Sequence, residues 1–144
     1  MPAYDSDRFD PPAPLAYVTL RNADNGTALP DVPMLLDSGA DVTLIPRSTV
    51  GELGAELVSD SRYELVGFDG NVSLANIVWL EMIFCGRTFR GRFLLIDQPW
   101  GILGRNILNA VGLFFDGPLL VWEEKRSGQA TPAVPAIESG AIGP

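Results

Sequence analysis

Histidine is absent from the 144 residues of this chain, and cysteine occurs only once, as Cys85. Without histidine there is no Ser-His-Asp triad and no Cys-His pair for nucleophilic catalysis. A zinc site needs histidines or several cysteines, so the sequence predicts no metal and no cofactor. Cys85 cannot form an intramolecular disulfide, and we interpret it as a small apolar filler on a strand, with a reactive thiol as the alternative. Carboxylates therefore remain as the groups for acid–base chemistry.

Basic residues are also few. Lys and Arg together number 10 against 18 Asp and Glu, which gives a formal net charge of -8 and a pI of about 4.3. Phosphate contacts need clustered basic side chains, so nucleic acid is a poor partner, and an anionic membrane surface is equally unsuitable. No apolar run is long enough to span a membrane, and the N-terminus lacks the basic and apolar regions of a signal peptide. The simplest expected location is the cytoplasm.

Hydrophobic residues, glycine and proline are plentiful. The chain is 47% hydrophobic and contains 15 Gly and 12 Pro, which favours one domain of short strands and turns over long helices. Residues 1–14, rich in Pro and Asp, are predicted to form a flexible arm, and residues 15–126 the folded domain. Residues 127–144 are predicted to be a disordered tail from their composition.

Alternating apolar residues predict a series of strands joined by tight turns. The expected strands cover residues 15–21, 32–36, 56–66, 73–84, 89–96 and 102–104, followed by a hairpin over 113–122. Pro33 suggests an irregular start to its strand, residues 59–61 interrupt another, and Glu81 is expected to point outward. One helical turn is expected at 47–53 and one short helix at 105–111.

Residues 34–46 contain the most informative pattern. Three apolar residues lead into Asp37-Ser38-Gly39, and an alternating segment, 42–45, follows. This pattern predicts a strand, a sharp turn and a second strand. The carboxylate of Asp37 should then lie at a strand end, directed out of the sheet. The Ser38 hydroxyl can donate or accept a hydrogen bond beside it, and Gly39 allows another backbone to approach closely.

This stretch resembles the active-site loop of retropepsins, the retroviral-type aspartic peptidases, in the residues Leu-Leu-Asp-Ser-Gly-Ala-Asp at 35–41. A second segment, Ile-Leu-Gly-Arg-Asn-Ile-Leu at 102–108, is similar to the part of these enzymes that runs from the last core strand into a short helix. The two motifs occur in the right order, and the resemblance covers roughly residues 16–122. It implies an all-β fold, a small closed retropepsin-like β-barrel with one short C-terminal helix, which forms half of a two-fold symmetric aspartic peptidase.

The resemblance implies that Asp37 is the catalytic carboxylate and that Ser38, Gly39 and Ala40 complete the active-site loop. Ser38 should hydrogen-bond across a dimer, and Gly39 should offer its backbone to substrate. The chemistry needs two carboxyl groups that share one proton. No other aspartate has the frame of two apolar residues before it and Ser-Gly after it. The second carboxylate should therefore come from Asp37 of another copy, so we expect a homodimer.

Further residues take roles from the same resemblance. Asp41 and Arg105 match a pair that forms an ion pair beneath the active site, with a solvated Arg105 as the alternative. The residues expected at the flap, a hairpin that closes over substrate, are Gly67, Phe68, Asp69 and Gly70; an ordinary surface hairpin is the alternative. Trp100 and Ile102 are expected to line substrate pockets. The hairpin at 113–122 is a candidate dimer contact or part of the core.

The sequence thus predicts a homodimeric aspartic endopeptidase that cuts polypeptides with a water molecule activated between two Asp37 carboxylates. Two alternatives remain: a non-catalytic dimerisation or protein-binding module of the same fold, and an acidic β-domain with an accidental motif, which would be a monomer. The intact Asp37-Ser38-Gly39 favours the enzyme, because a pure scaffold needs no carboxylate at that position.

Overall fold

The structure, a computed structural model, describes residues 2–66 and 72–126. Strands make up most of it, and the described part contains two short helices. The elements in chain order are β1 (Tyr4–Asp5), β2 (Ala13–Arg21), β3 (Ala28–Leu36), β4 (Leu44–Pro46), α1 (Ser48–Leu53), β5 (Leu57–Val66), β6 (Val72–Phe84), β7 (Arg87–Ile96), β8 (Gly101–Leu103), α2 (Arg105–Leu108), β9 (Leu113–Asp116) and β10 (Val121–Glu124).

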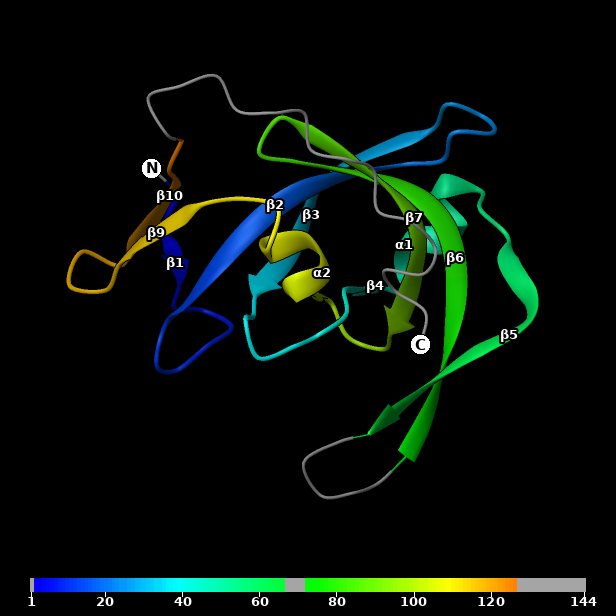
Figure 1. The fold of residues 1–144 in the computed structure, drawn as a ribbon, viewed down its shortest axis with the longest axis horizontal. Helices are drawn as coiled ribbons and strands as arrows, with labels where there is room; N and C mark the ends of the chain where they lie inside the picture. Colours follow the sequence, from blue (N-terminus) through cyan, green and yellow to red (C-terminus); the bar gives the residue numbers. More distant parts are fainter. Residues whose placement is uncertain (1, 67–71, 127–144) are drawn as a thin grey trace.

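Six strands close into a barrel (Figure 1). Hydrogen-bonded neighbours run in the order β2, β3, β8, β4, β7 and β6, and β6 pairs back with β2 to complete the ring. The β3–β8 and β4–β7 pairs are parallel, and the other pairs of the ring are antiparallel. The closed all-β barrel predicted from the family resemblance is therefore confirmed.

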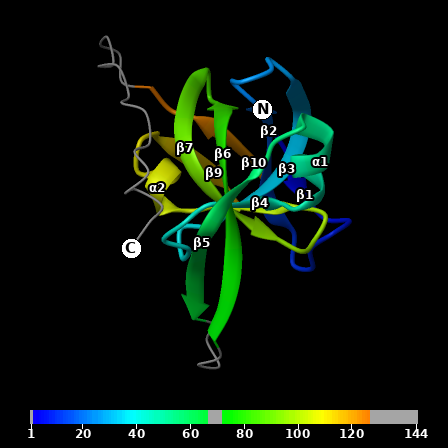
Figure 2. The ribbon, with the colours of Figure 1, turned by 90° about the vertical axis from the view of Figure 1, so that its right-hand side faces the viewer.

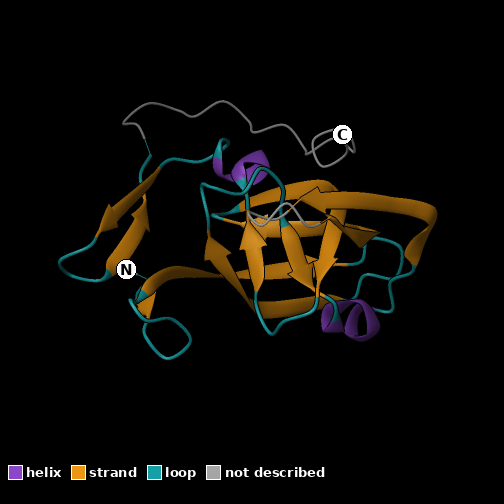
Figure 3. Cartoon of the chain, turned by 90° about the horizontal axis from the view of Figure 1, so that it is seen from below, coloured by secondary structure: helices purple, strands orange, loops and turns teal. Residues whose placement is uncertain are grey.

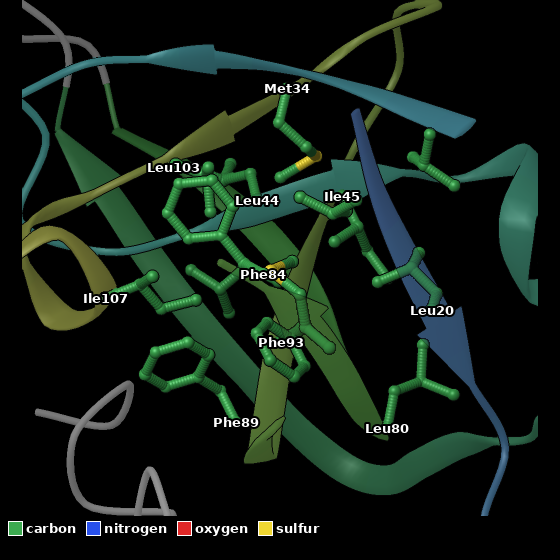
Figure 4. Close-up of a cluster of buried hydrophobic side chains, with 14 of the residues drawn as sticks. Leu20, Met34, Leu44, Ile45, Leu80, Phe84, Phe89, Phe93, Leu103 and Ile107 are labelled. Atoms are coloured by element: carbon green, nitrogen blue, oxygen red, sulfur yellow. The ribbon is translucent and has the colours of Figure 1, made fainter. Parts of the chain in front are cut away.

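The barrel interior is filled by side chains that alternate along the strands (Figure 4). On β6, Val78, Leu80 and Met82 are buried, whereas Trp79 between them is half-exposed. Figure 4 shows Leu80 among apolar side chains that come from several strands and from α2. Because successive residues of a strand point to opposite faces, this alternation puts one face of each strand in the core and the other outside.

Two strands are irregular: β3 before Pro33, which itself pairs in register with Tyr17, and β5 where the sequence predicted an interruption. In β3, Pro30 and Asp31 lie opposite the single Thr19 of β2, and Asp31 has a φ of 59°. This is a β-bulge, which bends the strand just after it starts. In β5, the register against β6 shifts between Leu57 and Arg62, which agrees with the interruption predicted at residues 59–61.

Both predicted helical segments are present, on different sides of the barrel (Figure 3). α1 ends at Gly54, whose φ of 61° lets it cap the helix in the left-handed conformation. α2 is shorter than the predicted helix over 105–111. Its continuation makes bonds three residues apart, from the Ala110 N–H to the Ile107 carbonyl at 2.9 Å and from the Val111 N–H to the Leu108 carbonyl at 3.3 Å. The segment therefore tightens into turns before Gly112.

The N-terminal residues do not form the flexible arm that their composition suggested. β1 pairs with β2, and the Tyr4 N–H donates to the Leu120 carbonyl at 2.8 Å. The Trp122 N–H donates to the Pro2 carbonyl at 2.9 Å, and its buried indole N–H donates to the Leu15 carbonyl at 3.0 Å. An extended, proline-rich segment can pair at a sheet edge as well as remain free, so composition misled here. Residues 127–144, the predicted tail, lie outside the described residues.

Glu81 lies on the outward side of β6, as predicted, but it is only 2% exposed. Arg21 Nε donates to its Oε1 at 2.7 Å, and Arg90 Nε and Nη2 donate to its Oε2 at 2.9 and 2.7 Å. Arg21 is on β2 and Arg90 on β7, so the carboxylate ties together the three strands where the ring closes. Hydrogen bonds from Arg21 and then Arg90 lower the pKa of the Glu81 carboxyl below its ordinary value of 4.5.

Glu81→Gln should lower the free energy of unfolding at neutral pH by about 1–3 kcal/mol, because charge-assisted hydrogen bonds to two arginines become neutral ones. Since the folded pKa is lowered, the carboxylate stabilises the fold above its unfolded pKa, and this contribution is lost as the pH falls through the folded pKa. The difference in free energy of unfolding between wild type and Glu81→Gln should thus shrink as the pH is lowered below the ordinary glutamate pKa of 4.5, as urea unfolding at a series of pH values would measure.

Glu52→Gln is the matched control, because Glu52 is exposed on α1. It should change stability by less than about 0.5 kcal/mol at any pH. If the loss of unfolding free energy in Glu81→Gln were as large in acid as at neutral pH, the stabilisation could not be assigned to the charged form of Glu81.

Candidate active site

Asp37 follows directly after β3, and the turn that it begins holds its carboxylate. The Gly39 N–H donates to Asp37 Oδ1 at 2.9 Å, and the Ala40 N–H donates to the Asp37 carbonyl at 3.1 Å. The N–H of Asp37 donates to the Leu103 carbonyl at 3.1 Å. These bonds restrain both its backbone and its side chain, so the half-buried carboxylate has a defined orientation at the end of the barrel.

The second motif lies directly against this loop. β3 and β8 pair in parallel as far as Leu36 opposite Leu103. Beyond that pair, the Arg105 N–H donates to the Ala40 carbonyl at 2.8 Å. Two motifs that are roughly 65 residues apart in sequence therefore form one unit around Asp37.

Two polar side chains that the sequence reading missed strengthen this contact. The fully buried Thr43 accepts a hydrogen bond on Oγ1 from the Gly104 N–H at 3.0 Å and donates to Asn106 Oδ1 at 2.7 Å. Thr43 was overlooked because it lies within an alternating strand pattern. A polar residue within the otherwise apolar run 42–45 was the available signal, since a buried hydroxyl needs a partner.

Glycines allow the two backbones to come this close. A Cβ on Gly104 would lie 2.2 Å from the Val42 carbonyl oxygen, and one on Gly101 would lie 2.4 Å from the Leu44 carbonyl oxygen. Gly104 has a φ of -93°, which any residue can adopt. Glycine is therefore required there for space rather than for backbone conformation.

Arg105 does not form the ion pair with Asp41 that the resemblance implied. Its Nη1 donates to the Ser38 carbonyl at 2.7 Å, and both side chains of the expected pair are exposed. Within residues 2–66 and 72–126, no ion pair joins Asp41 to Arg105. An exposed ion pair gains little over hydration, whereas the Ser38 carbonyl offers the guanidinium a fixed acceptor. Arg105 still links α2 to the active-site loop, but through the backbone.

A cavity of about 350 Å³ separates this loop from the hairpin of β9 and β10. Its lining includes Leu36 and Ser38 from the active-site end, Leu108 from α2, and Leu113 and Phe115 from β9. The hairpin extends away from the barrel (Figure 3). It carries several exposed large apolar side chains, namely Phe114, Phe115, Leu119 and Leu120.

The predicted flap residues, Gly67 to Gly70, lie outside the described residues. The strands on either side of them are described, and they pair as far as Val66 opposite Val72. Figure 2 shows β5 and the first part of β6 running together beyond the barrel. Residues 67–71 therefore connect two antiparallel strands, as a hairpin assignment requires.

Of the two predicted pocket residues, Ile102 lies on the strand that pairs with β3, and Trp100 lies before that strand starts. Ile102 is half-buried on β8, between Leu35 of β3 and Leu44 of β4. Trp100 precedes β8, and its ring packs edge-on against Phe9 with the centroids 5.1 Å apart. Phe9 was missed because its segment was predicted to be mobile. Its signal was an aromatic residue in a polar, proline-rich stretch, where exposure would be unfavourable.

Cys85 lies in the turn between β6 and β7, as the predicted strands 73–84 and 89–96 imply, and it is therefore not a filler on a strand; its φ is 54°. Burial raises the pKa of its thiol to about 11. The thiol is thus protonated near neutral pH and is a poor nucleophile. Among the described residues, no group of three or more His, Cys, Asp or Glu is arranged to hold a metal ion. No helix in the same part of the chain is long and apolar enough to cross a membrane.

Comparison with known proteins gives two similarities. A family model described as retroviral aspartyl protease matches residues 12–115. Among solved structures, the EIAV protease complexed with the inhibitor HBY-793 is 26% identical in sequence, with a TM-score of 0.50. This similarity covers 67% of the present chain and 86% of the EIAV protease chain. The family match includes both motifs and all six barrel strands, and it ends within β9, before β10.

Gly104→Ala should destabilise the protein by about 3 kcal/mol, because the added methyl group would overlap the Val42 carbonyl and force the two motifs apart. Gly51→Ala is the control: it lies within α1 with no atom within 4 Å of an added Cβ, so it should be neutral or slightly stabilising. Chemical denaturation of both variants measures this. Equal free energies of unfolding for Gly104→Ala and Gly51→Ala would show that the backbones at Gly104 and Val42 can move apart without destabilising the protein.

Proposed function

We propose that this chain, which belongs to the retroviral aspartyl protease family, is an aspartic endopeptidase that works as a homodimer. The observation that carries the proposal is the position of Asp37. Its half-buried carboxylate is held at the end of the barrel by Gly39 and by the close approach of the second motif. Such a restrained carboxylate suits acid–base chemistry, in which the reacting group must have a fixed direction.

The chemistry needs two carboxyl groups, so a two-fold axis would place Asp37 of each copy beside its counterpart. Like charges about 3 Å apart do not both ionise easily, and the pair therefore holds one proton. The ionised group takes a proton from water as the water oxygen attacks the scissile carbonyl, which the protonated group polarises. The resulting tetrahedral intermediate collapses when a proton passes to the amine and the C–N bond breaks. No covalent enzyme intermediate and no cofactor enters this sequence.

The hairpin of β9 and β10 is the surface that best supports a second copy. Four of its large apolar side chains, Phe114, Phe115, Leu119 and Leu120, are exposed, and a partner bound at the hairpin would cover apolar surface. Phe115 also lines the cavity that reaches Ser38. A copy bound at this hairpin would therefore lie next to the active-site loop, where Ser38 could hydrogen-bond across the interface.

The substrate would be an extended polypeptide bound over the Asp37 pair. The backbones of Gly39 and Ala40 would border the carboxylates, and Ile102 on β8 and Trp100 before it would supply apolar side chains to pockets for the peptide. The flap assigned to Gly67, Phe68, Asp69 and Gly70 would close over the peptide. The same fold used only for dimerisation or protein binding would keep the interface but would show no turnover.

Asp37→Asn should abolish peptidase activity and leave the fold intact, since an amide cannot act as the base. Digestion of a peptide library by the wild type and by Asp37→Asn in parallel measures this. Asp41→Asn is the control, because Asp41 is exposed in the same loop and makes no described ion pair. If Asp37→Asn cleaved peptides at a rate within about tenfold of wild type, Asp37 would not be the catalytic base. A wild-type dimer without any peptidase activity would instead favour the non-catalytic binding module.

Specific activity should fall on dilution, because a monomer holds half a site. Phe115→Glu should shift the protein to monomer and remove activity with it, whereas Tyr17→Glu, at an exposed aromatic on β2, should do neither. Analytical ultracentrifugation and turnover measured over the same concentrations test this. Full turnover by a sample shown to be monomeric would disprove the shared pair of carboxylates.

The rate should have a bell-shaped dependence on pH. Activity is lost in acid, when both carboxyl groups of the pair are protonated, and at higher pH, when both are ionised. The optimum should lie on the acid side, because isolated aspartates titrate near about pH 4. EDTA and a thiol-alkylating reagent should leave the rate unchanged. A single limb that rises from acid to alkaline pH, or loss of activity on chelation, would contradict this chemistry.

A further inference from the structure

A second hollow lies on the outer surface of the barrel, around the half-exposed Trp79. It consists of two pockets of about 330 and 590 Å³ that share Asn22, Asp24 and Trp79, and we refer to them together as the Trp79 groove. One pocket continues to Glu81 and Arg90, and the other to Leu57 and Glu56 at the start of β5. Both volumes lie in the range of ligand-binding clefts.

The walls of the Trp79 groove combine apolar surface with charge. Trp79 is 50% exposed and Leu57 is 41% exposed, so each side chain could bury further apolar surface against a bound partner. At one end, Arg21 and Arg90 surround Glu81 and leave a net charge of +1. Both oxygens of Glu81 are occupied by the Nε and Nη2 groups of the two arginines, while their Nη1 groups have no partner among the described residues. The side chains of Arg90 and Arg21 are 64% and 42% exposed, so an outside acceptor can reach both guanidinium groups.

The opposite end of the Trp79 groove has the other sign. Glu56 lines the larger pocket, and Asp24 lies on the rim that both pockets share. Asp24 lines both pockets and Glu56 lines only the larger one, so a bound carboxylate would be repelled more strongly at the Glu56 end, whereas Arg90 offers it a cation at the other end. This polarity is found in a protein whose overall charge is -8.

The groove is held in shape before any partner binds. Asn22 and Asn25 each donate a side-chain hydrogen bond to the Leu53 carbonyl at the end of α1, both at 3.1 Å. The Asp24 N–H donates to Asn22 Oδ1 at 3.0 Å. The turn between β2 and β3 is thus fixed to α1, and binding would require little ordering of this wall.

The Trp79 groove is also remote from Asp37. The turn that forms its wall precedes β3, and Asp37 follows β3, which is nine residues long. A strand of that length spans roughly 25–30 Å. Figure 1 shows this turn at the far right of the barrel and the loop after β3 nearer its left side. A partner in the groove would therefore leave the Asp37 end free.

We propose that the Trp79 groove is a docking site for an extended peptide that carries an acidic side chain two residues from a large apolar one. The acidic side chain binds the exposed guanidinium of Arg90, which lines the groove, and the apolar side chain packs on Trp79. Trp79 and Glu81 are two residues apart on β6, about 7 Å, and side chains on one face of an extended peptide repeat at the same interval. The proposal does not depend on the proposed peptidase activity.

Binding of fluorescein-labelled hexapeptides tests the proposal, with fluorescence anisotropy as the readout. The probes contain Glu-Ala-Phe or Phe-Ala-Glu, to allow both chain directions, and each has counterparts with Gln for Glu and with Ala for Phe. The protein carries Asp37→Asn so that no probe is cleaved. We expect one of the two probes to bind and both of its counterparts to bind about tenfold or more weakly. No binding of either probe up to millimolar concentration overturns the proposal.

Variants locate the site. Trp79→Ala should weaken binding about tenfold or more, and Arg90→Gln should weaken the Glu probe while leaving the Gln probe unchanged. Tyr17→Ala, at another exposed aromatic, and Arg8→Gln, at another arginine paired with a carboxylate, are the matched controls and should keep full affinity. Thermal melts confirm that every variant is folded. Equal affinity for wild type and Trp79→Ala, or equal losses in the controls, would overturn the assignment to this groove.

Discussion

The structure depends on the close crossing of two backbone segments at one end of the barrel. Residues 101–106 pass so near the loop after β3 that Gly104 lies against Val42 with no room for a Cβ. This contact lets β8 pair in parallel with β3, places the Leu103 carbonyl in reach of the Asp37 N–H, and buries Thr43 with its two partners. The direction of the Asp37 carboxylate is therefore set by a long-range backbone contact as much as by its own turn.

The barrel is closed at a different place, by a different kind of interaction. β2 and β6 share only three residue pairs, Thr19 with Ile83, Leu20 with Met82 and Arg21 with Glu81. Because so few backbone pairs join these two strands, side-chain hydrogen bonds add to the stability of this seam. Glu81 accepts such bonds from Arg21 of β2 and from Arg90 of β7. A carboxylate that is buried in this way needs its two arginines. Glu81 and Arg90 line the same pocket as Trp79, so the seam that closes the barrel also forms one end of the Trp79 groove.

Much of the fold was predictable, because its strands follow a period of two and its two motifs occur in a fixed order. The barrel, both helical segments and the irregular part of β5 agree with that reading. What failed were inferences from composition or from single charges. Residues 2–5 of the proline-rich N-terminus pair with β2 and with residues 120–122, and Glu81, which faces outward as predicted, is covered by arginines from strands distant in sequence. The hydrogen-bond partner of Arg105 was also missed, because it is the backbone carbonyl of Ser38, and the direction of a carbonyl cannot be predicted from a pattern of residue types.

In the proposed homodimer, the N-terminal pairing would limit how a second copy approaches. Pro2 and Tyr4 bond to one edge of β10 within the same chain, so that edge is occupied. β9 pairs with β10 on one side only, and its other edge has no strand beside it among the described residues. Phe115 on β9 borders the cavity that reaches Ser38, whereas β10 lies beyond the family match. The N-terminal segment and β10 therefore support β9 from behind, and the side of the hairpin left for a partner is the one that faces the active-site loop.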